Sequence, residues 1–237
     1  LITPELSVCG YPPHDLIDRP EMFERNERVL EALAEQTRGQ TCALLVGHVA
    51  RNPSGQGRPA CNAVSVLENG REVFRQFKTL LPTYDVFDEA RYFESAPGVQ
   101  LWEKSDLRIA FAICEDLWAD EPGQGRKRYG RNPIEEYRRL RPDLLISASA
   151  SPYEWGKREK REKIHQEVTR KLGIPLIYVN QVGATDEILF DGASFVLSAA
   201  GNHIGRLPVF QESFGCLDLS GAGSDPKFLE PAQEGRE

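Results

Sequence analysis

Residues 107–118 have the sequence LRIAFAICEDLW, in which a run of apolar residues ends at a cysteine. The first seven residues are typical of a buried strand. Cys114 follows at once, ahead of Glu115 and Asp116. A cysteine where a strand opens into a turn or helix is a candidate nucleophile, because helix dipoles lower the pKa of a thiol. The two acidic neighbours oppose this unless a cation counters them, and spacing alone favours a buried, inert cysteine.

Further apolar runs alternate with helical repeats along the chain. Runs of strand length occur at residues 41–49, 143–149 and 175–180. Apolar residues at helical spacing or a proline at a first turn predict helices at residues 20–37, 133–141 and 157–172. Asn69-Gly70 predicts a hairpin over residues 60–77, and a second is expected over residues 193–209. This alternation with hairpins indicates an α/β layered fold with a mixed sheet.

The composition is that of a folded chain with a core. Of the 237 residues, 40% are hydrophobic, and 29 basic against 36 acidic residues give a net charge of −7. The hydrophobic content excludes a disordered chain, and the acidic balance disfavours a nucleic-acid partner. No apolar run approaches the ~18 residues that a membrane span needs, so no membrane partner is expected. The length fits one large domain or two small ones.

Several short motifs are better explained without a site. The five cysteines include no C-x-x-C pair, which favours a reducing, cytoplasmic compartment. The four histidines are scattered without the spacing of metal ligands, so no metal site is predicted. A Gly-x-Gly-x-x-Ala run at residues 55–60 opens no helix and is interpreted as a loop. The basic run at residues 157–163 is interpreted as a solvated helix face, with anion binding at its start as the alternative.

Two further candidates stand at predicted strand ends. Glu5 follows the apolar start of the chain, and Lys78 ends the second strand of the first hairpin. Taken singly, each is more typical of a surface residue than of a catalytic one. In the order Glu5, Lys78, Cys114, however, they resemble the catalytic set of the nitrilase superfamily, the carbon–nitrogen hydrolases.

Longer stretches narrow this resemblance. Six are similar to the glutaminase domain of glutamine-dependent NAD⁺ synthetases, at residues 4–16, 78–89, 113–118, 149–158, 178–183 and 186–195. The resemblance implies a four-layer αββα sandwich over residues 1–220. The Gly- and Pro-containing tail, residues 221–237, is expected to be a linker towards an ATP-dependent synthetase domain. Because the chain starts at Leu1 and contains no Ser-Gly-Gly-x-Asp-Ser loop, we interpret it as a fragment without that domain and without the family's first strand and helix.

The resemblance also implies a reaction, the hydrolysis of L-glutamine to L-glutamate and ammonia. Cys114 would attack the side-chain amide and form a thioester. Glu5 would move the thiol proton to the leaving nitrogen and then activate water. Lys78, helped by the backbone N–H of Glu115, would stabilise the oxyanion and favour the thiolate. Glu89 would be a second carboxylate that assists the acid–base steps or places Lys78.

Four residues are expected to contact the substrate. By resemblance, Tyr84 contacts glutamine and Trp118 forms a wall of the pocket, with packing in the core as the alternative for both. Ser151 and Lys157 match positions that meet the amino and carboxylate ends of the substrate. Lysine is a point charge and not a bidentate fork, so its hold on a carboxylate should be less directional than that of arginine.

The resemblance extends to partners outside this domain. Ammonia would pass to the synthetase domain, where ATP and Mg²⁺ are expected and deamido-NAD⁺ is amidated; no cofactor is expected in the glutaminase domain. A homo-oligomer is also expected. One alternative is a free-standing nitrilase-superfamily amidase that acts on another amide, a carbamoyl compound or a nitrile through the same three residues. The other is an inactive scaffold for protein interaction, which the intact set of three residues argues against.

Overall fold

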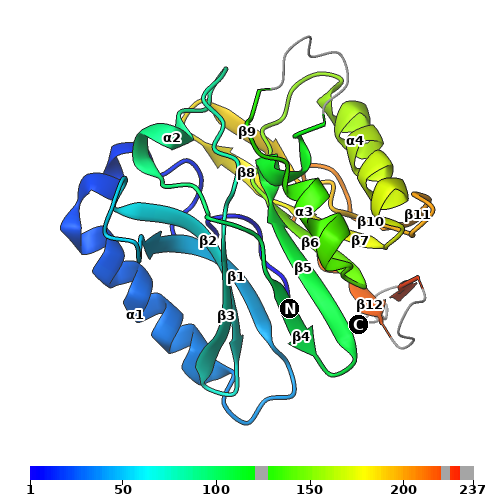
Figure 1. Ribbon diagram of the computed structural model, residues 1–237, viewed down its shortest axis with the longest axis horizontal. Coiled ribbons are helices and arrows are strands. Elements are labelled where there is room, and N and C mark those ends of the chain that lie inside the picture. Colours follow the sequence, from blue (N-terminus) through cyan, green and yellow to red (C-terminus); the bar gives the residue numbers. More distant parts are fainter. Residues whose placement is uncertain (121–127, 220–224, 230–237) are drawn as a thin grey trace, which may run out of the picture.

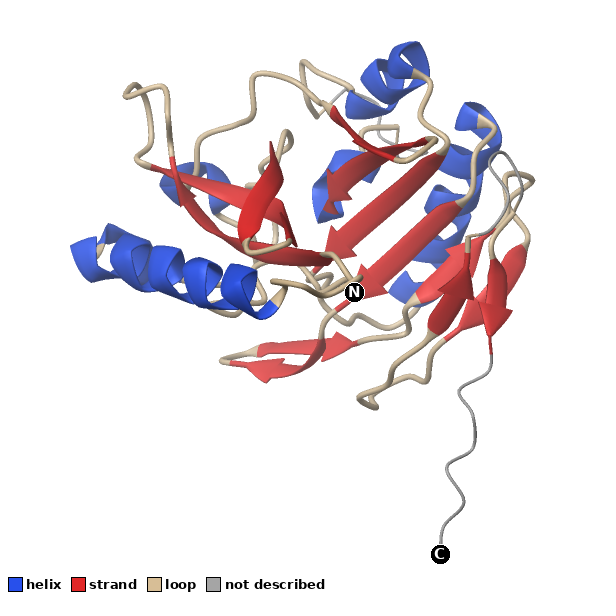
Figure 2. Ribbon diagram, turned by 90° about the horizontal axis from the view of Figure 1, so that it is seen from below, coloured by secondary structure: helices blue, strands red, loops and turns tan. Residues whose placement is uncertain are grey.

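Two β-sheets face each other in the structure, and helices cover the outer face of each sheet (Figure 1, Figure 2). The structure is a computed structural model and describes residues 1–120, 128–219 and 225–229. Its layers are α1 (Pro20–Gln36), the first sheet, the second sheet, and the pair α3 (Pro133–Leu140) and α4 (Lys157–Leu172). The α/β fold is therefore the one that the sequence patterns predict, and the αββα order of layers is the one that the resemblance implies.

The first sheet is antiparallel and has the strand order β1-β2-β3. Its strands are β1 (Leu44–Arg51), β2 (Ala60–Glu68) and β3 (Arg71–Phe77). The predicted hairpin joins β2 to β3, and Asn69 and Gly70 in its turn have φ of 49° and 82°. Positive φ at both central residues is what a tight two-residue hairpin turn requires. Because β3 ends at Phe77, this hairpin places Lys78 at the end of the first sheet.

The second sheet is mixed and has the order β11-β10-β7-β6-β5-β4. Three parallel strands form its centre, β5 (Leu107–Ile113), β6 (Leu144–Ser149) and β7 (Leu176–Asn180). Antiparallel strands flank them, β4 (Leu101–Lys104), β10 (Phe195–Leu197) and β11 (His203–Arg206). The parallel strands have their carboxyl ends at one edge of the sheet, which is where α/β folds place their ligands. Cys114 follows β5 at this edge.

Apolar side chains fill the space between the sheets. Val64 and Val66 of β2 pack in one cluster with Phe111 of β5 and Ile146 of β6. Side chains on a strand alternate between its faces, so the neighbouring residues of both sheets point to the helices instead. There, Leu30 of α1 belongs to a cluster with residues of β1 and β2, whereas α3 and α4 pack on the second sheet.

The predicted helices and strands are confirmed, and short elements that the sequence analysis does not predict complete the fold. Besides β4, these are η1 (His14–Asp18), α2 (Glu89–Tyr92), η2 (Cys114–Leu117), β8 (Val182–Thr185), β9 (Ile188–Asp191), β12 (Cys216–Asp218) and β13 (Lys227–Leu229). Each spans too few residues to show a hydrophobic period. Among the described residues, no helix has the length and apolar character to cross a membrane.

The predicted linker over residues 221–237 is described only in part. Within it, β13 pairs with β12, so residues 227–229 are hydrogen-bonded to the fold. Residues 220–224 and 230–237 lie outside the described residues. The boundary between domain and linker therefore stays a prediction.

Gly47 of β1 permits a close approach of the segment that carries Glu5. A Cβ atom at Gly47 would overlap with the backbone of Pro4 and Leu6. Backbone cannot turn away as a side-chain tip can, so we expect Gly47→Ala to lower the free energy of unfolding by about 1–3 kcal/mol. Urea unfolding measures this loss. Gly130→Ala is the control, because a Cβ atom there has no neighbour within 4 Å in the described part of the chain; equal losses in both variants would contradict the prediction.

Candidate active site

Three segments of the chain supply Glu5, Lys78 and Cys114: Glu5 and Lys78 are in contact, and the charges of both act on the Cys114 thiol. The segment before Glu5 runs beside β1, where Ile2 pairs with Leu45 and the Thr3 N–H donates to the Leu45 carbonyl at 3.0 Å. Lys78 directly follows β3 of the first sheet, and Cys114 directly follows β5 of the second. The site therefore combines residues from both sheets at one end of the sandwich.

A buried lysine between two carboxylates forms the centre of the site. The Lys78 Nζ donates to Glu5 Oε1 and to Glu89 Oε1, both at 2.7 Å. Glu5 is 0% exposed and Lys78 1% exposed, so this is an interior ion cluster. Burial disfavours the ammonium form, but Glu5 and Glu89 outweigh burial and hold the pKa of Lys78 well above its ordinary value. Lys78 therefore stays a cation at neutral pH, which suits it to stabilise an oxyanion.

Glu89 is the second carboxylate of this cluster, as the resemblance implies. Its Oε1 also accepts a hydrogen bond from the Tyr11 hydroxyl at 2.8 Å. Burial raises the pKa of Glu89 to about 7, Lys78 opposes this rise, and the charge of Glu5 adds to it. Two buried carboxylates share one cation, so the second is readily protonated near neutral pH. Tyr11 is not predicted from the sequence, although it lies six residues after Glu5 within residues 4–16.

Asp116 holds the turn that presents Cys114. Its Oδ1 accepts the backbone N–H groups of Thr79 and Leu80 at 2.9 and 2.8 Å, and its Oδ2 accepts that of Ile113 at 3.0 Å. One carboxylate thus ties the chain after Lys78 to the chain around Cys114. Cys114 itself has φ of 42°, a strained conformation for a residue with a Cβ atom. The sequence analysis treats Asp116 only as an opposing charge and misses this role.

The structure corrects the expectation that the surroundings favour a thiolate. Burial raises the pKa of the Cys114 thiol, the charge of Glu5 raises it further, and Lys78 lowers it only in part. The turn after Cys114 is a four-residue 3₁₀ helix, too short to supply the dipole of an α-helix. The resting nucleophile is therefore a thiol, and its attack requires a base that removes the proton.

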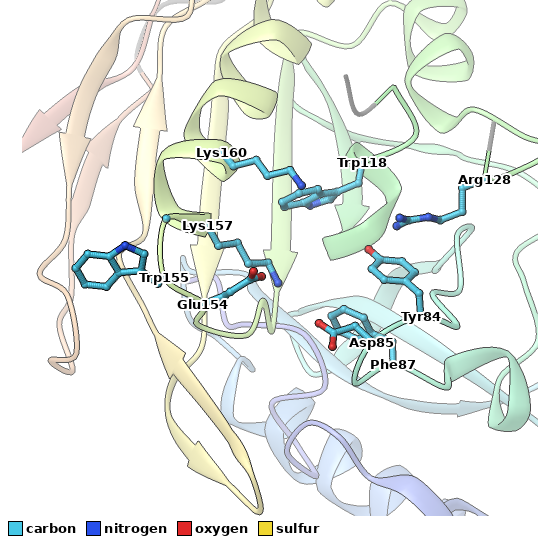
Figure 3. A pocket seen from close by; sticks show the side chains of 10 residues that line it. Tyr84, Asp85, Phe87, Trp118, Arg128, Glu154, Trp155, Lys157 and Lys160 are labelled. Carbon is cyan, nitrogen blue, oxygen red and sulfur yellow. The ribbon is translucent and has the colours of Figure 1, made fainter. Parts of the chain in front are cut away.

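A pocket of about 290 Å³ contains three of the four predicted substrate-binding residues (Figure 3). Its lining combines aromatic rings with charges of both signs, namely Tyr84, Asp85, Phe87, Trp118, Arg128, Glu154, Trp155, Gly156, Lys157 and Lys160. Figure 3 shows the Lys157 side chain directed towards Asp85 and Phe87, whereas the Trp155 ring points away from them. Burial lowers the pKa of Lys157. The sequence analysis misses Asp85, Arg128 and Glu154, which have no spacing that distinguishes them from surface charges.

Glu115 lies behind the pocket and contacts its wall. Its carboxylate accepts hydrogen bonds from the Tyr84 hydroxyl at 2.9 and 3.0 Å and from the Tyr129 hydroxyl at 2.6 Å. Burial raises the pKa of Glu115, and these hydroxyls and the Lys78 cation oppose the rise. Arg128 stacks on the Tyr84 ring, with 3.5 Å between its Cζ and the ring centroid. Glu115 thus holds Tyr84 through its side chain, while the predicted role of its backbone N–H stays a prediction.

Ser151 is placed differently from the other predicted substrate contacts. It is 3% exposed and is not among the residues that line the pocket. Its backbone N–H donates to Asn180 Oδ1 at 2.8 Å. The preceding residue, Ala150, donates its N–H to Glu5 Oε2 at 2.9 Å. A contact between Ser151 and substrate stays a prediction. Among the described residues, no group of three His, Cys, Asp or Glu side chains could hold a metal ion.

Comparison with known proteins finds relatives along nearly the whole chain. The sequence model of the carbon-nitrogen hydrolase family matches residues 1–122. A glutamine-dependent NAD(+) synthetase of Synechocystis is 43% identical over 225 residues, covering 93% of this chain and 40% of that protein. One of Acinetobacter baylyi is 33% identical, covering 98% of this chain and again 40% of that protein. The chain thus spans about two fifths of the length of these relatives.

Solved structures share the fold. Glutamine-dependent NAD+ synthetase from Acinetobacter baumannii, solved with ADP, superposes with a TM-score of 0.82 at 31% identity, over 98% of this chain and 41% of that one. A nitrilase-superfamily amidase from Nesterenkonia has a TM-score of 0.72 at 19% identity, over 88% of this chain and 73% of that one. The amidase shows the shared fold alone. With a family match over more than half of its length, the chain belongs to the carbon–nitrogen hydrolase family.

Proposed function

We propose that the chain hydrolyses the side-chain amide of L-glutamine to L-glutamate and ammonia. The observation that carries this proposal is the buried Lys78 between Glu5 and Glu89, beside a cysteine at a strand end and a pocket with charges of both signs. The names of the relatives that match nearly the whole chain support glutamine as the substrate. A simple amide or nitrile offers no charged group to the Lys157 ammonium or to the Asp85 and Glu154 carboxylates of the pocket.

The first half of the reaction forms a thioester. Glu5 takes the proton of the Cys114 thiol as the sulfur attacks the amide carbon, because the raised pKa of the thiol leaves little thiolate at rest. Lys78 stabilises the negative charge that develops on the amide oxygen, with the backbone N–H of Glu115 as a second donor. Glu5 then passes the proton to the nitrogen, the C–N bond breaks, and ammonia leaves.

The second half hydrolyses the thioester. Glu5 accepts a proton from water, whose oxygen attacks the thioester carbon, and Lys78 again stabilises the oxyanion. The C–S bond breaks, Cys114 regains its proton, and L-glutamate is released. Glu89 keeps Lys78 in place and, since burial raises its pKa to about 7, it can bind a proton near neutral pH.

The charged pocket accounts for the choice of a zwitterionic substrate. Lys157 is the cation we assign to the α-carboxylate of glutamine, and Asp85 and Glu154 are carboxylates available to its α-ammonium group. Tyr84 and Trp118 supply the apolar walls for the methylene groups between these charges and the amide. Opposite charges at a fixed separation favour glutamine over an uncharged amide.

In the longer relatives, the name links glutamine use to NAD⁺ synthesis. We propose that the ammonia made by this chain serves the same purpose, the ATP-dependent amidation of deamido-NAD⁺. ATP and Mg²⁺ would bind outside the described residues. The homo-oligomer and the cytoplasmic location stay predictions.

Loss of the nucleophile tests the proposed reaction most directly. We expect Cys114→Ala to lower ammonia release from glutamine by at least about a thousandfold, because no other group can form the thioester. Ammonia is measured with the whole protein on glutamine, asparagine and a simple nitrile. Cys61→Ala is the control, since it removes another buried thiol, on the opposite face of β2 from Asn62, which donates to Glu5. Release that survives Cys114→Ala would refute the assignment, and turnover of another amide in place of glutamine would refute the substrate.

Lys157 should act on substrate binding and not on chemistry. We expect Lys157→Met to raise KM for glutamine by about 10- to 100-fold and to leave kcat nearly unchanged, because the lost contact is present in both ground and transition states. Steady-state kinetics separate the two constants. Lys163→Met, on the exposed face of the same helix, should change neither; an equal loss in both variants would indicate damage to α4.

Glu89 should make stability depend on pH. Its pKa rises from 4.5 to about 7 on folding, so the unfolded chain releases this proton first and the folded state loses stability as pH rises between these values. The Glu89→Gln variant has no titrating group at this position. The difference between its free energy of unfolding and that of the wild type should therefore shift in favour of the variant, by about 3 kcal/mol at most, as pH rises over this range. Urea unfolding of both proteins at about pH 5 and about pH 8 measures the gain. A constant difference between them would contradict the raised pKa.

A further inference from the structure

The carboxylate of Glu5 is held by donors on both of its oxygens. Oε1 accepts from Lys78 Nζ and from Asn62 Nδ2, each at 2.7 Å. Oε2 accepts the backbone N–H of Ala150 at 2.9 Å. Donors on Oε1 alone would let the carboxylate swing about that oxygen. The Ala150 N–H therefore fixes the plane of the carboxylate, and its own position becomes a condition for proton transfer.

Ala150 lies where the chain leaves the second sheet. It directly follows β6, and the backbone pairing of β6 with β7 ends at Ser149 and Asn180. Beyond this point the side chain of Asn180 continues the pairing. Its Oδ1 accepts the Ser151 N–H at 2.8 Å, and its Nδ2 donates to the Ser151 carbonyl at 3.4 Å. One amide group thus satisfies both backbone groups of Ser151, as a neighbouring strand would.

The orientation of the Asn180 amide is itself determined by buried acceptors. Its Nδ2 also donates to the Gly192 carbonyl at 3.0 Å and to Asp191 Oδ1 at 3.3 Å. With three acceptors around the nitrogen, the oxygen end must face the Ser151 N–H. Asp191 Oδ1 in turn accepts from Arg161 Nη2 at 2.9 Å, and Arg161 and Asp191 are each 1% exposed. Because of this ion pair, Asp191 remains a hydrogen-bond acceptor for Asn180 Nδ2. The Asn180 amide therefore cannot flip and exchange its oxygen and nitrogen.

We propose that Asn180 is a positioning residue for the catalytic base. Through Ser151, Asn180 positions the Ala150 N–H, which sets the orientation of the Glu5 carboxylate. The ion pair Arg161–Asp191 fixes the orientation of the Asn180 amide. Asn180 touches no reacting atom in this scheme. The inference rests on the proposed function in that Glu5 is taken as the base, but it holds for any amide substrate.

Turnover of the whole protein is the first measurement. Without the amide, Ser151 and Ala150 are free to move, and misplacement of a reacting group by about 1 Å costs about 100-fold in rate. We expect Asn180→Ala to lower kcat for amide hydrolysis by about 10- to 100-fold with KM within about twofold of the wild type. Asn132→Ala is the matched control, because it removes the hydrogen bonds of another side-chain amide, from the Ile134 N–H at 3.0 Å and to Asp120 Oδ1 at 2.6 Å, and neither partner is bonded to Glu5.

Alkylation of Cys114 by iodoacetamide is the second measurement and needs no amide turnover. A misplaced Glu5 takes the thiol proton less readily, so Asn180→Ala should slow alkylation at neutral pH by about 3- to 10-fold. A merely loosened structure would expose the buried thiol and speed alkylation. Peptide mapping distinguishes Cys114 from the other cysteines. Asn180→Asp, which keeps the side-chain volume but loses the Nδ2 donors, should slow alkylation as well and serves if the alanine variant does not fold.

The outcomes separate the inference from the proposed function. Slower alkylation and lower kcat in the Asn180 variants, with Asn132→Ala unchanged, would support the positioning role. Unchanged or faster alkylation would overturn it, even if turnover fell. If the wild type ignores glutamine while alkylation of Cys114 still depends on Asn180, the proposed substrate fails and the positioning role stands.

Discussion

A single buried ammonium group shared by two carboxylates is the constraint on which the rest of the site depends. Each charge that leaves water costs several kcal/mol, so the interior must supply partners for all three groups. Tyr11, Asn62 and the Ala150 N–H do so together with Lys78 itself. The cluster would carry a net negative charge if both carboxylates were ionised. Glu89, whose pKa burial raises to about 7, can relieve that charge by binding a proton.

This charge cluster also explains why the site needs both sheets. Lys78 directly follows a hairpin of the first sheet, whereas Cys114 directly follows β5, one of the three parallel strands of the second. Asp116 bridges the two by accepting backbone N–H groups from Thr79, Leu80 and Ile113. The site can therefore form only where the two sheets pack against each other.

The buried charge cluster and the pocket have different roles, the first in acid–base chemistry and the second in substrate recognition. Inside, burial keeps Cys114 a thiol, while Glu5 and Glu89 keep Lys78 charged, so the thiol stays unreactive until a base removes its proton. Outside, Lys157 and the carboxylates of the pocket offer charges that a zwitterion can satisfy. Glu115 lies between these regions and joins them through the Tyr84 hydroxyl. Recognition of substrate can thus change at the pocket without altering the buried acid–base machinery.

Local patterns in the sequence by themselves determined the α/β class with a mixed sheet, the Asn69-Gly70 hairpin and the strand-end places of Lys78 and Cys114. The four-layer order followed from the family resemblance. Period, turn chemistry and strand ends are properties of neighbouring residues, so a sequence can reveal them. Family resemblance then singled out Glu5, Lys78 and Cys114, and the structure brings Glu5 and Lys78 into contact. The raised pKa of Cys114, the bridge through Asp116 and the support of Glu5 by Ala150 and Asn180 were decided only by the tertiary structure. They depend on burial and on contacts between residues as far apart as Glu5 and Ala150, which no local pattern encodes.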